Sequence, residues 1–374
     1  MTHEKGIKLN VRVLNAFLII GLVIVLLVGL YATQWNKPKA EEPKAPVKQA
    51  NLLVTVIAPP KCDDCFDKAA YAAAIRQLPN VNVTENNLEY NSTEAKELIT
   101  KYNIGRLPAA IVTGETANLS LTSFKEKEGA YYFDDTPPPY YNVSQRRVIG
   151  RISITYITST ACPNCFDITQ FSEQLKGVGV AISAQRKIDA SDKDAQAMIT
   201  KYRITKIPAM LISGDALEYA VVAQVWSLVG TQESDGMLVM RNISAPYYDF
   251  ADSKVHGLVT ITYITDTSCT DCYNVSMHKD VLKQSFGMAF APDKSVDLST
   301  KAGKDLVKKY GIRYVPTLLL DKEAAAYGSL NEAWQQVGVI ADDGNYVFSN
   351  INMLGGITFK DLETNQTNTT PAAQ

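Results

Sequence analysis

Six cysteines are the residues of this chain best suited to covalent chemistry, and they form three CxxC pairs. The sequences CDDC, CPNC and CTDC place Cys62 with Cys65, Cys162 with Cys165, and Cys269 with Cys272. Two cysteines at this spacing can exchange a disulfide with another protein, close a structural disulfide, or supply two ligands of a zinc site. The spacing alone leaves all three alternatives open.

A proline follows each cysteine pair at a nearly constant distance. Pro108, Pro208 and Pro316 come 46, 46 and 47 residues after the first cysteine of their pairs, inside KYNIGRLPAAIV, KYRITKIPAMLI and KYGIRYVPTLLL. A β-rich apolar run precedes each pair, as NLLVTVI, RISITYI or LVTITYI. The chain therefore contains three copies of one unit, and we expect domains at 51–145, 146–252 and 253–360.

Hydrophobic period and turn residues predict the same order of elements in each copy. A strand runs into the cysteine pair, a helix begins at the first cysteine, and a second strand and a second helix follow. The proline opens a third strand, and a hairpin that turns at Asp-Gly closes the second and third copies. At the end of the second strand we expect an acidic residue to cap a loop and a serine to cap the next helix: Glu89 and Ser92, Asp189 and Ser191, and Asp297 and Ser299.

This order of elements resembles the thioredoxin-like superfamily, and the whole chain resembles a membrane-anchored, tandem relative of the protein disulfide isomerases. The resemblance implies an α/β fold of three tandem thioredoxin-like domains, each a central mixed sheet with flanking helices. It also implies a cis-proline loop that faces the cysteines, in which the backbone of the residue before the proline is open to a substrate. These substrate-binding residues are Leu107 and Pro108, Ile207 and Pro208, and Val315 and Pro316.

Two departures from that family concern the cysteine site itself. No copy has the Trp-Cys-Gly-Pro-Cys or Trp-Cys-Gly-His-Cys signature. The buried acid that family members carry six residues before the first cysteine is replaced here by Val56, Tyr156 and Tyr263.

The position of the first cysteine predicts its reactivity. A helix N-terminus stabilises the thiolate form of a cysteine over the thiol, because unpaired N–H groups and the helix dipole favour negative charge. The uncharged CPNC predicts that Cys162 is the most acidic, followed by Cys269 in CTDC and Cys62 in CDDC, where two carboxylates oppose a thiolate. We therefore expect all three pairs to be catalytic, with the second cysteine of each pair as the resolving thiol.

Zinc and inert disulfides remain the alternatives to a redox-active dithiol. A structural zinc site needs four ligands, each pair supplies two, and the only histidines are His3, His256 and His278. Inert disulfides would leave a non-catalytic thioredoxin-fold protein that binds or holds other proteins.

The N-terminal region predicts attachment to a membrane. Residues 13–31, VLNAFLIIGLVIVLLVGLY, carry one polar side chain and no charge, so we expect a transmembrane helix after a cytoplasmic tail at 1–12. A cleaved signal peptide is the alternative. We expect a linker at 32–50, extracytoplasmic domains, which eight N-x-S/T sequons favour, and a disordered tail at 361–374.

The composition and motifs of the chain indicate which classes of partner and cofactor to expect. A formal net charge of −2 argues against nucleic-acid binding. No nucleotide or flavin motif occurs, so we expect no cofactor and a separate redox partner. The predicted function is a membrane-anchored thiol–disulfide oxidoreductase or isomerase, whose clients are extracytoplasmic proteins with thiols or disulfides.

Overall fold

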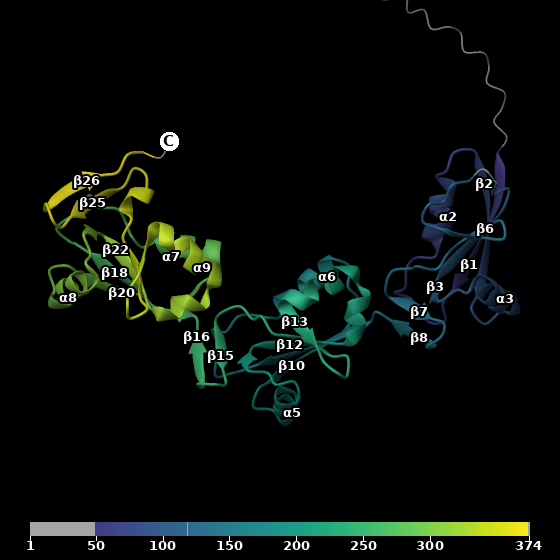
Figure 1. The fold of residues 1–374 in the computed structure, drawn as a ribbon, viewed down its shortest axis with the longest axis horizontal. Coiled ribbons are helices and arrows are strands. Elements are labelled where there is room, and N and C mark those ends of the chain that lie inside the picture. Colours follow the sequence, from purple (N-terminus) through teal and green to yellow (C-terminus); the bar gives the residue numbers. More distant parts are fainter. Residues whose placement is uncertain (1–48, 118, 373–374) are drawn as a thin grey trace, which may run out of the picture.

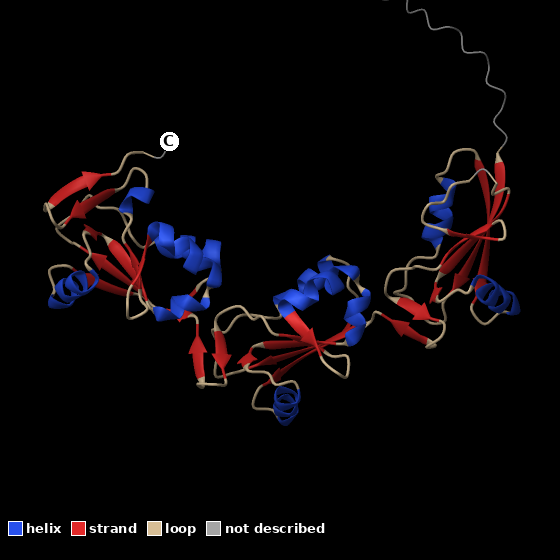
Figure 2. Cartoon of the chain, viewed as in Figure 1, coloured by secondary structure: helices blue, strands red, loops and turns tan. Residues whose placement is uncertain are grey.

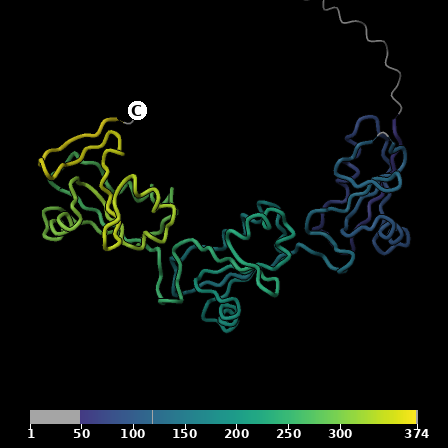
Figure 3. Tube along the Cα trace, viewed as in Figure 1, coloured from purple at the N-terminus to yellow at the C-terminus, as the bar shows by residue number. Residues whose placement is uncertain are grey.

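The computed structural model describes residues 49–117 and 119–372, which form three units of mixed α/β structure along the chain (Figure 1). Each unit contains one five-stranded sheet. The chain passes from each unit to the next without returning (Figure 3). The segment 13–31 lies outside the described residues, and within those residues none of the helices combines the length and apolar character needed to cross a membrane.

The three main sheets share one strand order, which is consistent with thioredoxin-like domains. In the first unit the order is β2 (Val81–Glu89), β1 (Ala50–Ala58), β4 (Ala109–Gly114), β6 (Ala130–Phe133) and β5 (Lys125–Lys127). In the second it is β10 (Ile182–Asp189), β9 (Ile152–Thr158), β12 (Ala209–Ile212), β14 (Leu238–Met240) and β13 (Gly230–Gln232). In the third it is β20 (Lys294–Asp297), β18 (Ile261–Thr265), β22 (Thr317–Leu320), β24 (Tyr346–Phe348) and β23 (Gly338–Ile340).

Helices lie on both faces of each sheet (Figure 2). The helix that joins the two parallel strands is α2 (Ala69–Arg76), α4 (Gln170–Gly177) or α7 (Met277–Phe286). The next helix is α3 (Thr93–Tyr102), α5 (Lys193–Lys201) or α8 (Lys301–Tyr310). The second and third units add the 3₁₀ helices η1 (Gly214–Glu218) and η2 (Lys322–Ala326) and the helices α6 (Ala220–Val229) and α9 (Gly328–Val337). The third unit also has β17 (Leu258–Val259), β19 (Ala289–Phe290) and η3 (Ile351–Met353).

The first strand of each unit lies inside the sheet between two layers of helix, and β1 is fully buried over its last five residues, Val54–Ala58. In β1, Leu52, Val54 and Val56 join the apolar cluster of α2, whereas Ile57 joins the cluster that contains Tyr102 of α3. A strand buried on both faces is apolar almost throughout, and this explains the NLLVTVI-type runs.

The predicted helix caps are confirmed at one position and wrong by one residue at two. The Ser92 hydroxyl accepts the N–H of Ala95 and caps α3. Asp192 and Thr300, rather than Ser191 and Ser299, occupy the N-cap positions of α5 and α8. The Ser191 hydroxyl donates instead to Asp189, 2.7 Å away, and this bond holds it in the preceding turn.

A hairpin follows the main sheet of each unit and pairs with two residues just before the proline. These hairpins are β7 (Tyr140–Asn142) with β8 (Arg147–Ile149), β15 (Tyr247–Asp249) with β16 (Lys254–His256), and β25 (Thr358–Asp361) with β26 (Gln366–Thr369). The first two straddle the predicted domain boundaries at 145/146 and 252/253.

The third hairpin corrects the prediction of a disordered tail at 361–374. Strand β26 forms a four-residue antiparallel ladder with β25, and Thr370 beyond it is buried. Backbone pairing orders this segment, although its own side chains are too polar to form an apolar face.

The chain leaves the first two hairpins through a glycine whose backbone is bonded on both sides. The N–H of Gly150 donates to Asp215 and its carbonyl accepts from the Tyr219 hydroxyl, 2.7 Å away. Gly257 makes the equivalent bonds with Glu323 and Tyr327. Each junction between units is therefore held by hydrogen bonds to the 3₁₀ helix of the following unit and to the tyrosine after it.

We expect Gly150→Ala to destabilise the first junction. The new Cβ would lie 2.4 Å from the Cβ of Pro138, at a φ of +92°. The free energy of unfolding in urea should therefore fall by more than the ~1–2 kcal/mol that left-handed backbone alone costs an alanine.

Gly179→Ala is the matched control, because Gly179 has a φ of +83° and no atom within 4 Å of the added Cβ. Equal losses in the two variants would show that the contact with Pro138 does not constrain the junction.

Candidate active site

The three cysteine pairs occupy equivalent loops, directly after the first strand of each unit. Each pair is closed as a disulfide, with Cα–Cα distances of 5.3, 5.3 and 5.5 Å. The first cysteine comes four residues after the end of β1, β9 or β18. The carboxyl end of the first strand thus presents the disulfide at the equivalent edge of the mixed sheet in each unit.

The helix after each pair begins later than predicted. It starts at Ala69, Gln170 or Met277, seven or eight residues after the first cysteine. Two residues past the second cysteine, the side chain of Asp67, Asp167 or Asn274 accepts the backbone N–H two residues further on, and this bond closes a turn ahead of the helix.

The late start of the helix removes one reason to expect acidic thiols at the first cysteine of each pair. The cysteines lie in turns ahead of the helix, so the helix dipole does not act directly on their sulfurs. The predicted order of acidity, Cys162 before Cys269 before Cys62, stays a prediction and depends on local charges and burial. Cys162 is buried at 6% exposure, whereas Cys62 and Cys269 are partly exposed.

The proline loops meet the sulfurs in the second and third units. The Leu107–Pro108, Ile207–Pro208 and Val315–Pro316 peptide bonds are cis. The Sγ atom of Cys165 lies 3.9 Å from the carbonyl oxygen of Ile207, and that of Cys272 lies 3.9 Å from the carbonyl oxygen of Val315. Disulfide and pre-proline residue therefore form one site in these two units.

The backbone before each proline is not open, contrary to the prediction. The pre-proline strands β3 (Arg106–Leu107), β11 (Lys206–Ile207) and β21 (Tyr314–Val315) pair with β7, β15 and β25. Leu107, Ile207 and Val315 lie opposite Tyr141, Tyr248 and Lys360 in these ladders. The chain's own hairpin thus takes the edge that a substrate was expected to use.

In the second and third units the hairpin segment also contacts the cysteine loop. The N–H of Phe166, next to Cys165, donates to the carbonyl of Pro246, 2.7 Å away. The N–H of Tyr273, next to Cys272, donates to the carbonyl of Thr358, 2.9 Å away. The segment is therefore bonded both to the cysteine loop and to the pre-proline strand.

Two of the three acids at the end of the second strand, Asp189 and Asp297, cap this loop as expected, whereas capping by Glu89 stays a prediction. The Asp189 carboxylate accepts the Thr160 N–H at 2.7 Å and the Ser191 N–H at 2.9 Å; Asp297 does the same with Thr267 and Ser299. Hydrogen bonds from the following serine, first of all, lower the pKa of Asp189 and of Asp297 to about 2. Both carboxylates therefore stay ionised at physiological pH and bind the backbone of the loop that leads to the cysteines.

The residues that replace the family's buried acid are enclosed by the core. Val56, Tyr156 and Tyr263 are all buried. Burial raises the pKa of Tyr263 to about 12, so its hydroxyl stays neutral at physiological pH. These three positions supply no carboxylate that could move protons for the cysteines.

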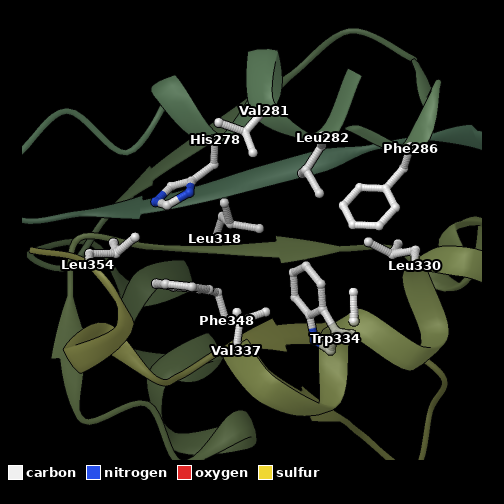
Figure 4. A pocket seen from close by; sticks show the side chains of 11 residues that line it. His278, Val281, Leu282, Phe286, Leu318, Leu330, Trp334, Val337, Phe348 and Leu354 are labelled. Atoms are coloured by element: carbon white, nitrogen blue, oxygen red, sulfur yellow. The ribbon is translucent and has the colours of Figure 1, made fainter. Parts of the chain in front are cut away.

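His278, one of the residues considered for zinc, lies in an apolar pocket of the third unit (Figure 4). The cavity measures about 190 Å³ and lies between α7 and α9, where Leu282 and Trp334 line it. The ring of His278 lies 3.3 Å from the Tyr273 hydroxyl and packs on Phe348, and burial lowers its pKa. Among residues 49–117 and 119–372, no group of three or more His, Cys, Asp or Glu could hold a metal ion.

Sequence reasoning missed a cation that lies beside the first disulfide. Arg151, from the start of the second unit, binds the Asp64 carboxylate, and its Nη2 atom lies 3.8 Å from the Sγ of Cys62. The hydrogen bond from Arg151 lowers the pKa of Asp64. No local signal marks this contact, because the two residues are 87 positions apart.

Comparisons with known proteins add little to this geometry. No protein-family profile and no curated protein matches the chain. It is similar to a crystal structure of ERdj5 (form II; 14% identity, 76% of this chain, 40% of that chain, TM-score 0.14) and to one of human ERp44 (8% identity, 82% and 92%, TM-score 0.14). A domain of the alkylhydroperoxide reductase AhpF from Enterococcus faecalis matches 44% of this chain and 83% of its own length, at 13% identity and a TM-score of 0.15.

The chain spans about two fifths of the length of that ERdj5 structure. Similarity at these scores carries no argument about activity. The assignment of thioredoxin-like units therefore rests on their own strand order and on the placement of cysteine pairs and prolines.

We expect Asp167→Ala to loosen the start of α4. The variant loses the acceptor of the Thr169 N–H, at 3.1 Å, and of the Thr169 hydroxyl, at 2.6 Å. Loss of such a hydrogen bond costs about 1 kcal/mol, so the amides at the start of α4 should exchange with solvent about fivefold faster.

Asp167→Asn is the control, because Asn274 makes the same bond in the third unit. If the asparagine variant exchanges as fast as the alanine variant, the amide oxygen does not serve as the cap.

Proposed function

We propose that this chain is a membrane-anchored thiol–disulfide oxidoreductase or isomerase that acts on extracytoplasmic proteins through its CxxC pairs. The observation that carries the proposal is the meeting of disulfide and proline loop, with the second sulfur 3.9 Å from the pre-proline carbonyl in two units. An isolated structural cross-link needs no such partner. Anchoring through 13–31 and the extracytoplasmic location rest on the sequence.

The chemistry is thiol–disulfide exchange in two steps. In a reduced pair, the thiolate of the first cysteine attacks a client disulfide, forms a mixed disulfide and releases one client sulfur as a thiolate. The second cysteine then attacks the first, which closes the pair and releases the reduced client. The reverse sequence oxidises client thiols, and an oxidising compartment favours that direction or isomerisation.

Either direction leaves the pair in the opposite redox state, so turnover as an oxidase or reductase needs a second dithiol or disulfide protein. A partner protein of that class would restore the pair by the same exchange. Isomerisation needs no net electron transfer, because the mixed disulfide is resolved by another thiol of the client.

The hairpin pairing favours a second candidate function, a scaffold with structural disulfides. The pre-proline edge of every unit is already paired within the chain, and Cys162 is buried. In that case the protein would bind other proteins without exchanging electrons with them.

The reduction potential of each pair separates the two functions. For redox-active pairs in the full chain we expect potentials above about −300 mV, because structural disulfides lie below that value. The measurement is equilibration with glutathione followed by alkylation and mass spectrometry of each pair.

Activity gives the second readout. The full chain should accelerate the reduction of insulin by glutathione, and a variant with serine at Cys62, Cys162 and Cys269 should not. Single variants at these positions show how the activity divides among the sites. Potentials below about −300 mV at all three pairs, with no insulin reduction, would establish the scaffold function instead.

We expect release of the hairpin in the third unit to speed exchange there. Lys360 lies opposite Val315 in the ladder, and Lys360→Pro removes the N–H that pairs at this position. Clients could then pair with the pre-proline strand, so the rate of mixed-disulfide formation at Cys269 should rise severalfold.

Lys360→Ala is the control, since it removes the ammonium group that bonds to Asp266 at 2.8 Å but keeps the backbone N–H. Equal rates in the two variants would mean that clients do not use this edge. The rates are read by trapping mixed disulfides with a peptide disulfide and quenching at intervals.

A further inference from the structure

The second unit supplies a guanidinium group to the cysteine pair of the first. Arg151 follows the junction Gly150 and reaches back over the CDDC turn. Its Nε atom lies 3.1 and 3.0 Å from the two carboxylate oxygens of Asp64, and its Nη2 atom lies 3.8 Å from the Sγ of Cys62. The same sulfur lies 3.6 Å from Asp64 Oδ1. Cys62 therefore has one carboxylate and one guanidinium at nearly equal distance.

The two charges have opposite effects on a thiolate. A carboxylate this close disfavours ionisation of the thiol, and a cation favours it. Because Arg151 forms a two-point ion pair with Asp64, it neutralises one of the two carboxylates that the sequence suggested would keep Cys62 protonated. The remaining N–H groups of the guanidinium can donate to the sulfur.

The junction holds Arg151 in place. The carbonyl of the preceding Gly150 accepts from the Tyr219 hydroxyl, and the N–H of the following Ile152 donates to the carbonyl of Ala181, 3.0 Å away. The backbone on both sides of Arg151 is thus fixed by the second unit. Two other titratable groups lie near this pair. Asp63 interacts electrostatically with Arg151, and the Tyr219 hydroxyl interacts electrostatically with Asp64.

The arrangement occurs at only one of the two junctions. At the second junction, Leu258 takes the place of Arg151 after Gly257, so the CPNC pair receives no cation from that position. The third pair is followed by its own hairpin, where the Thr367 hydroxyl lies 4.0 Å from the Sγ of Cys269. The three sites therefore differ in the groups that the segment after each unit places beside the cysteine pair.

We propose that Arg151 of the second unit stabilises the Cys62 thiolate of the first unit, so that the first cysteine pair depends on the second unit for its reactivity. This deepens the proposed exchange function and rests on it for its biological role. Cys62 then does not rank last in acidity, as its CDDC sequence suggested.

The exchange step balances without a proton from Arg151. Once a thiol redox partner has reduced the pair, the Cys62 thiol gives its proton to water. The thiolate attacks one sulfur of a client disulfide, the new S–S bond forms as the client bond breaks, and the other client sulfur leaves as a thiolate. Arg151 acts as a fixed positive charge that stabilises the thiolate before the attack.

The test is alkylation of the reduced full chain by iodoacetamide across about pH 4–10. Mass spectrometry of peptides that contain Cys62, Cys162 and Cys269 gives a separate pH profile for each thiol. In Arg151→Gln, the profile of Cys62 should move up by about one pH unit, within the range for an opposite charge at this distance. The other two profiles should not move, and they serve as internal controls in the same molecules.

Arg151→Lys is the matched variant, because it keeps the charge and loses the planar fork. Its Cys62 profile should lie between those of the wild type and Arg151→Gln. The proposal is wrong if Arg151→Gln leaves Cys62 unmoved, if all three thiols shift together, or if the lysine variant shifts as far as the glutamine variant.

The pH profile of alkylation can be measured whether or not the protein exchanges disulfides with clients. A shift confined to Cys62 in a protein that fails to reduce insulin would support the electrostatic inference and reject the exchange function. An unmoved Cys62 profile in a protein that does reduce insulin would reject the electrostatic inference and support the exchange function.

Discussion

Backbone pairing between the pre-proline strand and the following hairpin is the constraint on which the rest of each unit depends. Strands β3, β11 and β21 are only two residues long, yet each is bonded to a hairpin that comes more than thirty residues later. The pairing satisfies polar groups at the cysteine-bearing edge and limits access to it. Because β8 and β16 lead directly into the next unit, the same ladder also fixes where that unit begins.

One consequence is that adjacent tyrosines serve two units at once. Side chains alternate along a strand, so neighbouring residues of β7 and β15 face opposite ways. Tyr141 packs in the first unit, whereas the hydroxyl of Tyr140 donates to Glu218 of the second at 2.8 Å. Tyr248 packs in the second unit and Tyr247 against the core of the third. The hairpins therefore hold the cysteine site and the junction together.

The repeats and the order of elements along the chain could be predicted from the sequence, because they follow from periodicity and turn residues repeated three times; the proline loops that face the cysteines followed from the family resemblance. The start of the helix after the cysteines could not, since a turn closed by the side chain of Asp67, Asp167 or Asn274 comes first. The order of the polar tail and the approach of Arg151 to Cys62 depend on pairing over long sequence distances. Local patterns carry no information about such contacts.

The three disulfides differ in the groups that the chain places beside them as well as in the two residues between their cysteines. The first has a guanidinium from the next unit, the second is enclosed with Cys162 at 6% exposure, and the third faces a hydroxyl of its own tail. Charge, burial and hydrogen bonding each change the stability of a thiolate. Since exchange rates follow the thiolate fraction and its access, a tandem array of one fold can contain sites of different reactivity without any change in the fold itself.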